Sequence, residues 1–226
     1  MPPVALSDAT ERFSALMLRG EDSVPLDEAA LCIAAHGVVR LDVDAELRRL
    51  DELAEGCPPT VRGLVRFLWV EQGFAGDSAT YYDPRNSYLD QVVRRRRGIP
   101  ISLAVLAMEV GRRAGVALRG VGLPGHFVVR VEDEPDTYLD PFTGRLLDAE
   151  GCAELCRMAT GQPVVDPAWL APVGPYAICA RILANLKAIA ARHGERDALV
   201  WITRLRCLIP GVPDSERQEL ARLLAG

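Results

Sequence analysis

The feature that most constrains this chain is the segment 100–114, which is apolar around nearly its whole circumference when it is drawn as a helix. Pro100 suits the first turn of a helix, and Gly115 suits the left-handed position that ends one. The apolar side chains between them are Ile101, Leu103, Ala104, Val105, Leu106, Ala107, Met108 and Val110. A helix of this kind must be buried by several neighbours. The sequence therefore predicts a central helix over 100–114.

Three short segments after this helix have the composition of β-strands. They are residues 116–121, 127–131 and 137–139, with residues 132–136 as a hairpin loop, and they predict a small antiparallel sheet. His126 opens the second strand after a Pro-Gly turn, and Asp140 ends the third. A histidine and an aspartate on neighbouring strands that face the start of one helix are the arrangement of a nucleophile–histidine–carboxylate site.

Specific motifs surround these residues. They are Asp83-Pro84-Arg85-Asn86-Ser87-Tyr88-Leu89, Arg96-Arg97-Gly98-Ile99-Pro100-Ile101-Ser102-Leu103-Ala104, Val121-Gly122-Leu123-Pro124-Gly125-His126-Phe127 and Asp140-Pro141-Phe142. Together they resemble the SirB1 family of bacterial proteins, within the transglutaminase-like superfamily, over roughly residues 25–210. The resemblance implies an α+β, papain-like cysteine-protease core in which the central helix packs on the small sheet.

The resemblance also implies a cysteine at the start of the central helix. There the helix dipole and the histidine lower the thiol pKa, and the aspartate orients the imidazole ring. In this chain an ungapped comparison puts that position at about Pro100, which carries no nucleophile, and no cysteine lies between Cys57 and Cys152. His126 and Asp140 match the family pattern, whereas the nucleophile does not.

Three interpretations of the site follow. In the first, Ser102 replaces the cysteine, and Ser102, His126 and Asp140 form a serine-based acyl-transferase or a peptidase- or amidase-like hydrolase. This predicts a hydrogen bond between the Ser102 hydroxyl and His126. In the second, the site is non-catalytic or degenerate, and the retained cleft binds a peptide, a protein or a small ligand. In the third, Cys152 or Cys156 folds into the site. We favour the second, a binding or regulatory module, and leave enzymatic activity uncertain.

Five further residues are candidates for binding. Asn86 and Ser87 lie in a motif that suits either a ligand contact or a turn that caps the next helix. Arg96 and Arg97 belong to a run of four arginines, which suits either a solvated turn or a site for a phosphate, a carboxylate or an acidic partner. Gly125 shapes the backbone that presents His126.

Helical periodicity flanks the core on both sides. The expected helices before it cover 26–36, 44–56 and 60–72, and those after it cover 175–192, 195–208 and 214–225. The last set resembles a single tetratricopeptide-like hairpin, which must pack on the main domain or on a partner. We therefore expect an N-terminal helical region over 1–73, a transglutaminase-like core over 74–170 and C-terminal helices over 171–226.

Composition narrows the class of protein further. The net charge of −5 gives no general case for nucleic-acid binding. The six cysteines form no CxxC pair, and with three histidines they predict neither a metal site nor a cofactor. The N-terminus lacks the features of a secretory leader, and no apolar run reaches membrane-spanning length. We expect a cytoplasmic protein with a protein or peptide partner.

Overall fold

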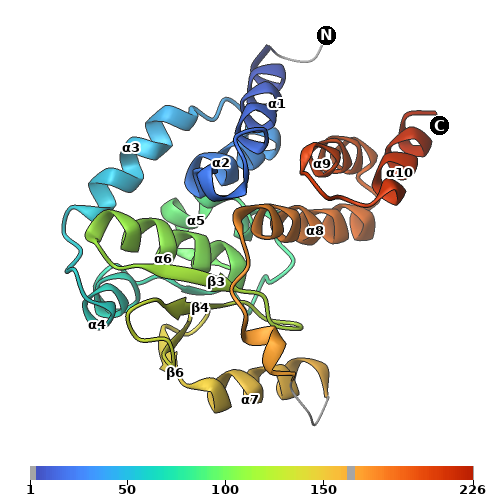
Figure 1. Cartoon of the computed structure of the whole chain (residues 1–226). Coiled ribbons are helices and arrows are strands. Elements are labelled where there is room, and N and C mark those ends of the chain that lie inside the picture. The colour runs from blue at the N-terminus through green and yellow to red at the C-terminus, as the bar shows by residue number, and fades with distance from the viewer. Residues whose placement is uncertain (1–3, 162–165, 226) are drawn as a thin grey trace.

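The computed structural model describes residues 4–161 and 166–225, with side chains from residue 8 onward. In this part of the chain the protein is a mostly helical α+β structure in which the helix α6 lies against a small sheet (Figure 1). The helices are α1 (Val4–Met17), α2 (Leu26–Gly37), α3 (Val43–Ala54), α4 (Val61–Val65), α5 (Leu89–Arg95), α6 (Pro100–Ala114), α7 (Ala149–Thr160), α8 (Pro175–His193), α9 (Arg196–Leu208) and α10 (Asp214–Ala225). The strands are β1 (Ala75–Gly76), β2 (Arg97–Gly98), β3 (Leu118–Val121), β4 (Val128–Val131), β5 (Tyr138–Asp140) and β6 (Arg145–Leu147).

The helix α6 has the bounds that its sequence predicts. Pro100 occupies its first turn, and Gly115 ends it with a φ of 82°, in the left-handed region. Every residue from Pro100 to Gly111 is buried, which agrees with the all-round apolar pattern. Gly111 brings β3 close, because a Cβ at this position would lie 3.0 Å from a δ-carbon of Leu118.

The main sheet has the strand order β3-β4-β5-β6, and all its neighbours are antiparallel. Its two faces are buried by different helices. Val129 and Leu139 belong to the large core around α6, whereas Val128 and Tyr138 pack with Cys152 and Cys156 of α7. Figure 1 shows α6 and α7 on opposite sides of the strands. The predicted strands and the hairpin loop over 132–136 are present, and β6 is an addition.

The region before the core is helical, as expected, with two differences. The expected helix over 60–72 begins at Val61 after a Thr60 cap, but its second half, Arg66–Glu71, is a single turn of π-helix. The helix α1 was not expected, and its buried Phe13, Leu16 and Met17 join the main core.

The C-terminal helices contribute to the same core as α6. Ile178, Ile182 and Leu183 of α8 are buried there together with residues of α2 and α6. The chain turns between α8 and α9 at Gly194, whose φ of 69° suits glycine. The division of the chain into the regions 1–73, 74–170 and 171–226 stays a prediction.

The described residues contain no helix that is both long and apolar enough to cross a membrane. Within the same residues, no three side chains of histidine, cysteine, aspartate or glutamate gather as a metal site would require.

Candidate functional site

His126 and Asp140 form a direct pair. Nε2 of His126 donates a hydrogen bond to Oδ1 of Asp140 at 2.8 Å, and both side chains are largely buried. The β4–β5 hairpin makes this possible, since it brings the start of one strand beside the end of the next. The prediction that these two residues meet is confirmed.

The turn after β5 holds Asp140 in place. The Phe142 amide donates to Oδ1 at 3.0 Å, and the Thr143 hydroxyl donates to Oδ2 at 2.6 Å. Burial by itself would raise the pKa of Asp140, but the bonds from His126 and Thr143 outweigh it, so the pKa lies below its usual value. Asp140 is therefore a carboxylate at neutral pH and fixes the orientation of the imidazole.

The other ring nitrogen of His126 is unpaired in the described part of the chain. Nδ1 forms no hydrogen bond with any described residue. Because Nε2 carries the proton shared with Asp140, the neutral ring presents Nδ1 as an acceptor. One aromatic side chain, that of Phe142, meets this ring edge-on, with centroids 6.5 Å apart, and Tyr81 in turn lies beside Phe142, with ring centroids 6.3 Å apart. Tyr81 and its neighbour Tyr82 are exposed.

An arginine from α8 holds the backbone that carries His126. Nη2 of Arg181 donates to the carbonyl of Leu123 at 3.0 Å and to that of His126 at 2.7 Å. The guanidinium also lies 5.6 Å from the ring centroid of Phe127. The C-terminal helices thus take part in positioning the site.

Ser102 does not have the hydrogen bonds of a serine nucleophile. Its side chain is 2% exposed. Its hydroxyl lies 2.5 Å from the carbonyl of Asn86, and it accepts from the Ile99 amide at 3.1 Å. A hydroxyl can donate only one hydrogen bond, and the Ser102 hydroxyl donates it to a backbone carbonyl. The hydrogen bond to His126 that the serine interpretation predicts is not among the interactions of Ser102 in the described structure.

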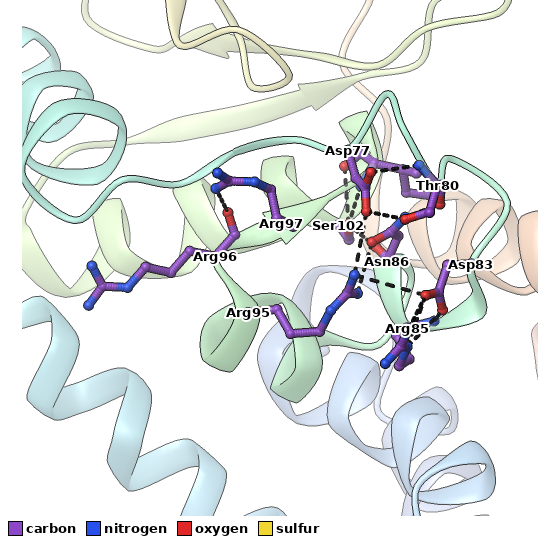
Figure 2. A network of polar contacts seen from close by, with 10 residues as sticks. Asp77, Thr80, Asp83, Arg85, Asn86, Arg95, Arg96, Arg97 and Ser102 are labelled. Carbon is purple, nitrogen blue, oxygen red and sulfur yellow. Dashed lines mark hydrogen bonds and ion pairs between the residues drawn. The ribbon is translucent and has the colours of Figure 1, made fainter.

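Asn86 lies at the centre of a polar network (Figure 2). Its Nδ2 donates to the carbonyl of Thr80 at 2.7 Å, and its Oδ1 accepts from Arg95 at 2.9 Å. Thr80 in turn donates to Asp77 from both its amide and its hydroxyl. Asn86 is fully buried, so its side chain is used within the fold. A binding role for Asn86 and Ser87 stays untested; Ser87 is also buried, and its hydroxyl has no partner among the described residues.

The arginine run has internal partners as well. Arg94 pairs with Glu46, and Arg95 approaches Asp77 at 3.4 Å. Arg96 donates to the carbonyl of Gln72, and Arg97 to that of Gly73 at 3.0 Å. Arg96 and Arg97 are exposed, so a further contact with an anion stays a prediction.

Gly125 has two reasons to be glycine. Its φ is +71°, and a Cβ at this position would lie 2.7 Å from the Cβ of Ala159.

The cysteines of α7 are unsuited to nucleophilic chemistry, since burial raises the pKa of Cys152 to about 12 and also raises that of Cys156. Both thiols are fully buried.

Sequence reasoning named neither Arg181 nor Tyr81 and Tyr82. Arg181 lies far from His126 along the chain, and no local pattern reveals the contact. The tyrosines had a visible signal, because they directly precede the Asp83 motif in a loop.

Comparisons with known proteins show the family to which the chain is similar. The family model of the Transglutaminase-like superfamily matches residues 37–184. A UPF0162 protein of Xylella fastidiosa is 38% identical over 95% of this chain and 83% of its own length. A UPF0162 protein of Pseudomonas aeruginosa is 35% identical over 81% of this chain and 72% of its own. The human F-box only protein 21 is 32% identical over 56% of this chain but only 21% of its own length. No solved structure gives a significant match.

The chain therefore belongs to the transglutaminase-like superfamily and, within it, to the SirB1 family, whose members here carry the designation UPF0162. The matched region contains α6, the sheet and both members of the His126–Asp140 pair.

Proposed function

We propose that this protein is a peptide-binding module without hydrolytic chemistry of its own. The observation that carries the proposal is the state of Ser102, whose hydroxyl is committed to backbone atoms while His126 remains paired and oriented. A base without a nucleophile can still accept a hydrogen bond. In this proposal, Nδ1 of His126 receives a donor from a bound peptide, such as a backbone N–H.

The surface beside His126 supports this role. Tyr81 is 38% exposed and Tyr82 is 56% exposed, and their rings meet edge-on at 5.4 Å. Arg192 of α8 lies over the Tyr82 ring at 4.9 Å. Exposed aromatic rings of limited mobility provide apolar contact area at low entropic cost. We propose that they bind apolar side chains of the peptide.

The relatives give a second line of support. The human F-box only protein 21 has similarity to this chain in only one fifth of its length. A segment that recurs within a much longer protein is consistent with a module that is combined with others. A regulatory role, which the family's association with bacterial regulation suggests, belongs to the same proposal, together with the cytoplasmic location expected from the sequence.

The chemical part of the proposal is tested with a fluorophosphonate probe for reactive serines. We expect no labelling that depends on Ser102, when the wild-type protein is compared with Ser102→Ala. Labelling lost in that variant, or turnover of an ester or amide substrate, would favour instead the serine-based hydrolase with Ser102, His126 and Asp140.

The binding part is tested by selecting peptides from a displayed random library on the wild-type protein. Binders are then measured against Tyr82→Ala and His126→Gln, with Met158→Ala as the control for an exposed apolar residue on α7. Each site variant should weaken binding about 10-fold or more, as the loss of one good contact does, and the control should not. Selected peptides that bind both site variants as tightly as the wild type would rule out this surface.

A further inference from the structure

The outer edge of β3 has hydrogen-bonding groups that the fold leaves unused. β3 is the edge strand of the main sheet. Opposite its far end the chain supplies a short partner, since Val121 forms a bridge with Pro172 and the Val173 amide donates to the carbonyl of Gly120 at 2.9 Å. The chain then leaves the edge at Pro175 to begin α8. Among the described residues, the edge therefore has a partner at one end and none at the other.

The direction of the unused groups follows from strand geometry. The carbonyl of Ala117 accepts from the Glu132 amide and so points toward β4, whereas the carbonyl of Gly120 points outward to Val173. In an antiparallel ladder, alternate residues direct both backbone groups to the same side. Leu118 therefore directs its N–H and its C=O outward, and neither has a partner among the described residues.

A cavity of about 500 Å³ lies along this open stretch. Its apolar wall comes from the start of α2, from α6 and from α8, through Leu26, Met108 and Ile178. Val173 and Pro175 border it where the chain's own partner segment ends. An unpaired strand edge beside an apolar cavity is the arrangement that binds an extended peptide, with the backbone groups giving affinity and the cavity receiving a side chain.

The charges at the rim indicate what kind of peptide fits. Arg112 pairs with Glu109 at 2.9 Å, and Arg119 pairs with Glu132 at 3.2 Å. These charges are matched within the chain, so the rim offers no net attraction to a charged segment. An uncharged peptide with a bulky apolar side chain complements it best.

We propose that the edge of β3 at Leu118 binds an extended, uncharged peptide segment of a partner protein, antiparallel to β3 and in line with residues 172–173. One residue of the peptide exchanges both backbone hydrogen bonds with Leu118, and an apolar side chain of the peptide enters the cavity. The surface is distinct from the ring of His126, and the proposal does not depend on that site.

The probes are acetylated and amidated peptides of sequence Thr-Val-Leu-Val-Thr and Thr-Val-Phe-Val-Thr, added to the isotope-labelled full chain and followed by NMR. The Leu118 amide should exchange rapidly with solvent in the free protein. On titration it should shift downfield and become protected, and the affinity should change less than twofold between low and high salt. A peptide with aspartate at its central position should bind at least 10-fold more weakly.

Two controls isolate the backbone pairing. N-methylation of the central peptide residue removes its donor without changing the protein and should abolish binding. Leu118→Pro removes an outward N–H and should preserve the fold while abolishing binding, whereas Arg119→Pro removes a ladder donor and should destabilise the sheet.

Three outcomes would overturn the proposal. The first is that the N-methylated peptide binds as well as its parent, and the second is that the peptides shift no amide of β3. The third is that sedimentation shows a dimer with a protected β3 edge, which would assign the edge to a second copy of this chain. Shifts confined to His126, Tyr81 and Tyr82 would refute the edge site but leave the proposed function intact, which separates the two failures.

Discussion

At the scale of single residues, the site depends on the hydrogen bonds that hold the buried Asp140 carboxylate. Its pKa is lowered in the folded protein, below the ordinary value of 3.8, because the His126 and Thr143 bonds outweigh the effect of burial. A carboxyl group with a depressed folded pKa adds stability above its unfolded pKa and loses that contribution as the pH falls through the folded one. The stability gained from Asp140 should therefore be constant near neutrality and disappear at pH values below 3.8.

This is measured by urea unfolding of the wild type and Asp140→Asn across this pH range. At neutral pH the substitution should cost about 1–3 kcal/mol, the usual effect of losing charge-assisted hydrogen bonds in a buried place. The difference between the two proteins should shrink on acidification. The exposed Asp133→Asn serves as the control. If the difference in unfolding free energy between the two proteins stayed constant with pH, the pKa of Asp140 would not be lowered in the folded protein.

Asn86 provides a second test at this scale. Its amide connects the carbonyl of Thr80 to Arg95, and its backbone carbonyl accepts from Ser102. Asn86→Ala removes a fully buried amide and its bonds to the Thr80 carbonyl and to Arg95, so we expect a loss of about 1–3 kcal/mol in unfolding free energy. Asn185→Ala, in the helix α8, should change it by less than about 0.5 kcal/mol. Equal effects of the two substitutions in chemical denaturation would contradict a structural role for Asn86.

At the scale of elements, α8 stabilises the turn that carries His126 through Arg181. Arg181→Met keeps most of the side chain's apolar stem but removes both bonds to the carbonyls of Leu123 and His126. The His126 amide itself donates to the Leu123 carbonyl at 3.2 Å, so it reports directly on this turn. Its hydrogen exchange should become at least about 10-fold faster, since 1.4 kcal/mol of lost protection corresponds to a factor of ten. The exposed Arg204→Met on α9 should leave that rate unchanged, and an unchanged rate in Arg181→Met would show that the turn holds itself.

Element boundaries show what local pattern can predict. Pro100 and Gly115 bracket α6 in the sequence and in the structure, because both act through their own backbone. The helix α1 was not predicted from the sequence, because it is stabilised by the packing of Phe13 and Leu16 in the core and has no clear local start or stop signal. The strand β6 is too short to show periodicity and is defined by its pairing with β5. At the site, the His126–Asp140 pair could be predicted because a hairpin joins the two residues. The orientation of Ser102 could not, since it depends on a carbonyl sixteen residues away.

At the scale of the whole molecule, a buried group of charges joins three helices. Asp27 of α2 and Glu109 of α6 are 3% and 5% exposed, and Arg113 lies between them. Arg113 donates to Asp27 at 2.6 Å, to Glu109 at 3.0 Å and to Asp51 of α3 at 2.7 Å. Burial raises the pKa of Glu109, and the neighbouring Asp27 raises it further, whereas Arg112 lowers it, so Glu109 depends on the nearby arginines to remain charged. This group fixes α2 and α3 to the central helix α6.

Removing Arg113 should therefore destabilise the fold far more than removing a surface arginine. Arg113→Met leaves buried carboxylates without their main partner, and breaking a buried pair in this way typically costs about 3–5 kcal/mol. Arg157→Met on α7 is the matched control, because Arg157 pairs with two exposed glutamates and exposed ion pairs of this kind contribute little to stability. Both values come from urea unfolding at neutral pH. Acidification should rescue part of the loss in Arg113→Met, since protonation removes the unpaired charges. A cost below 1 kcal/mol without any such rescue would show that α2, α3 and α6 are held together by apolar packing alone.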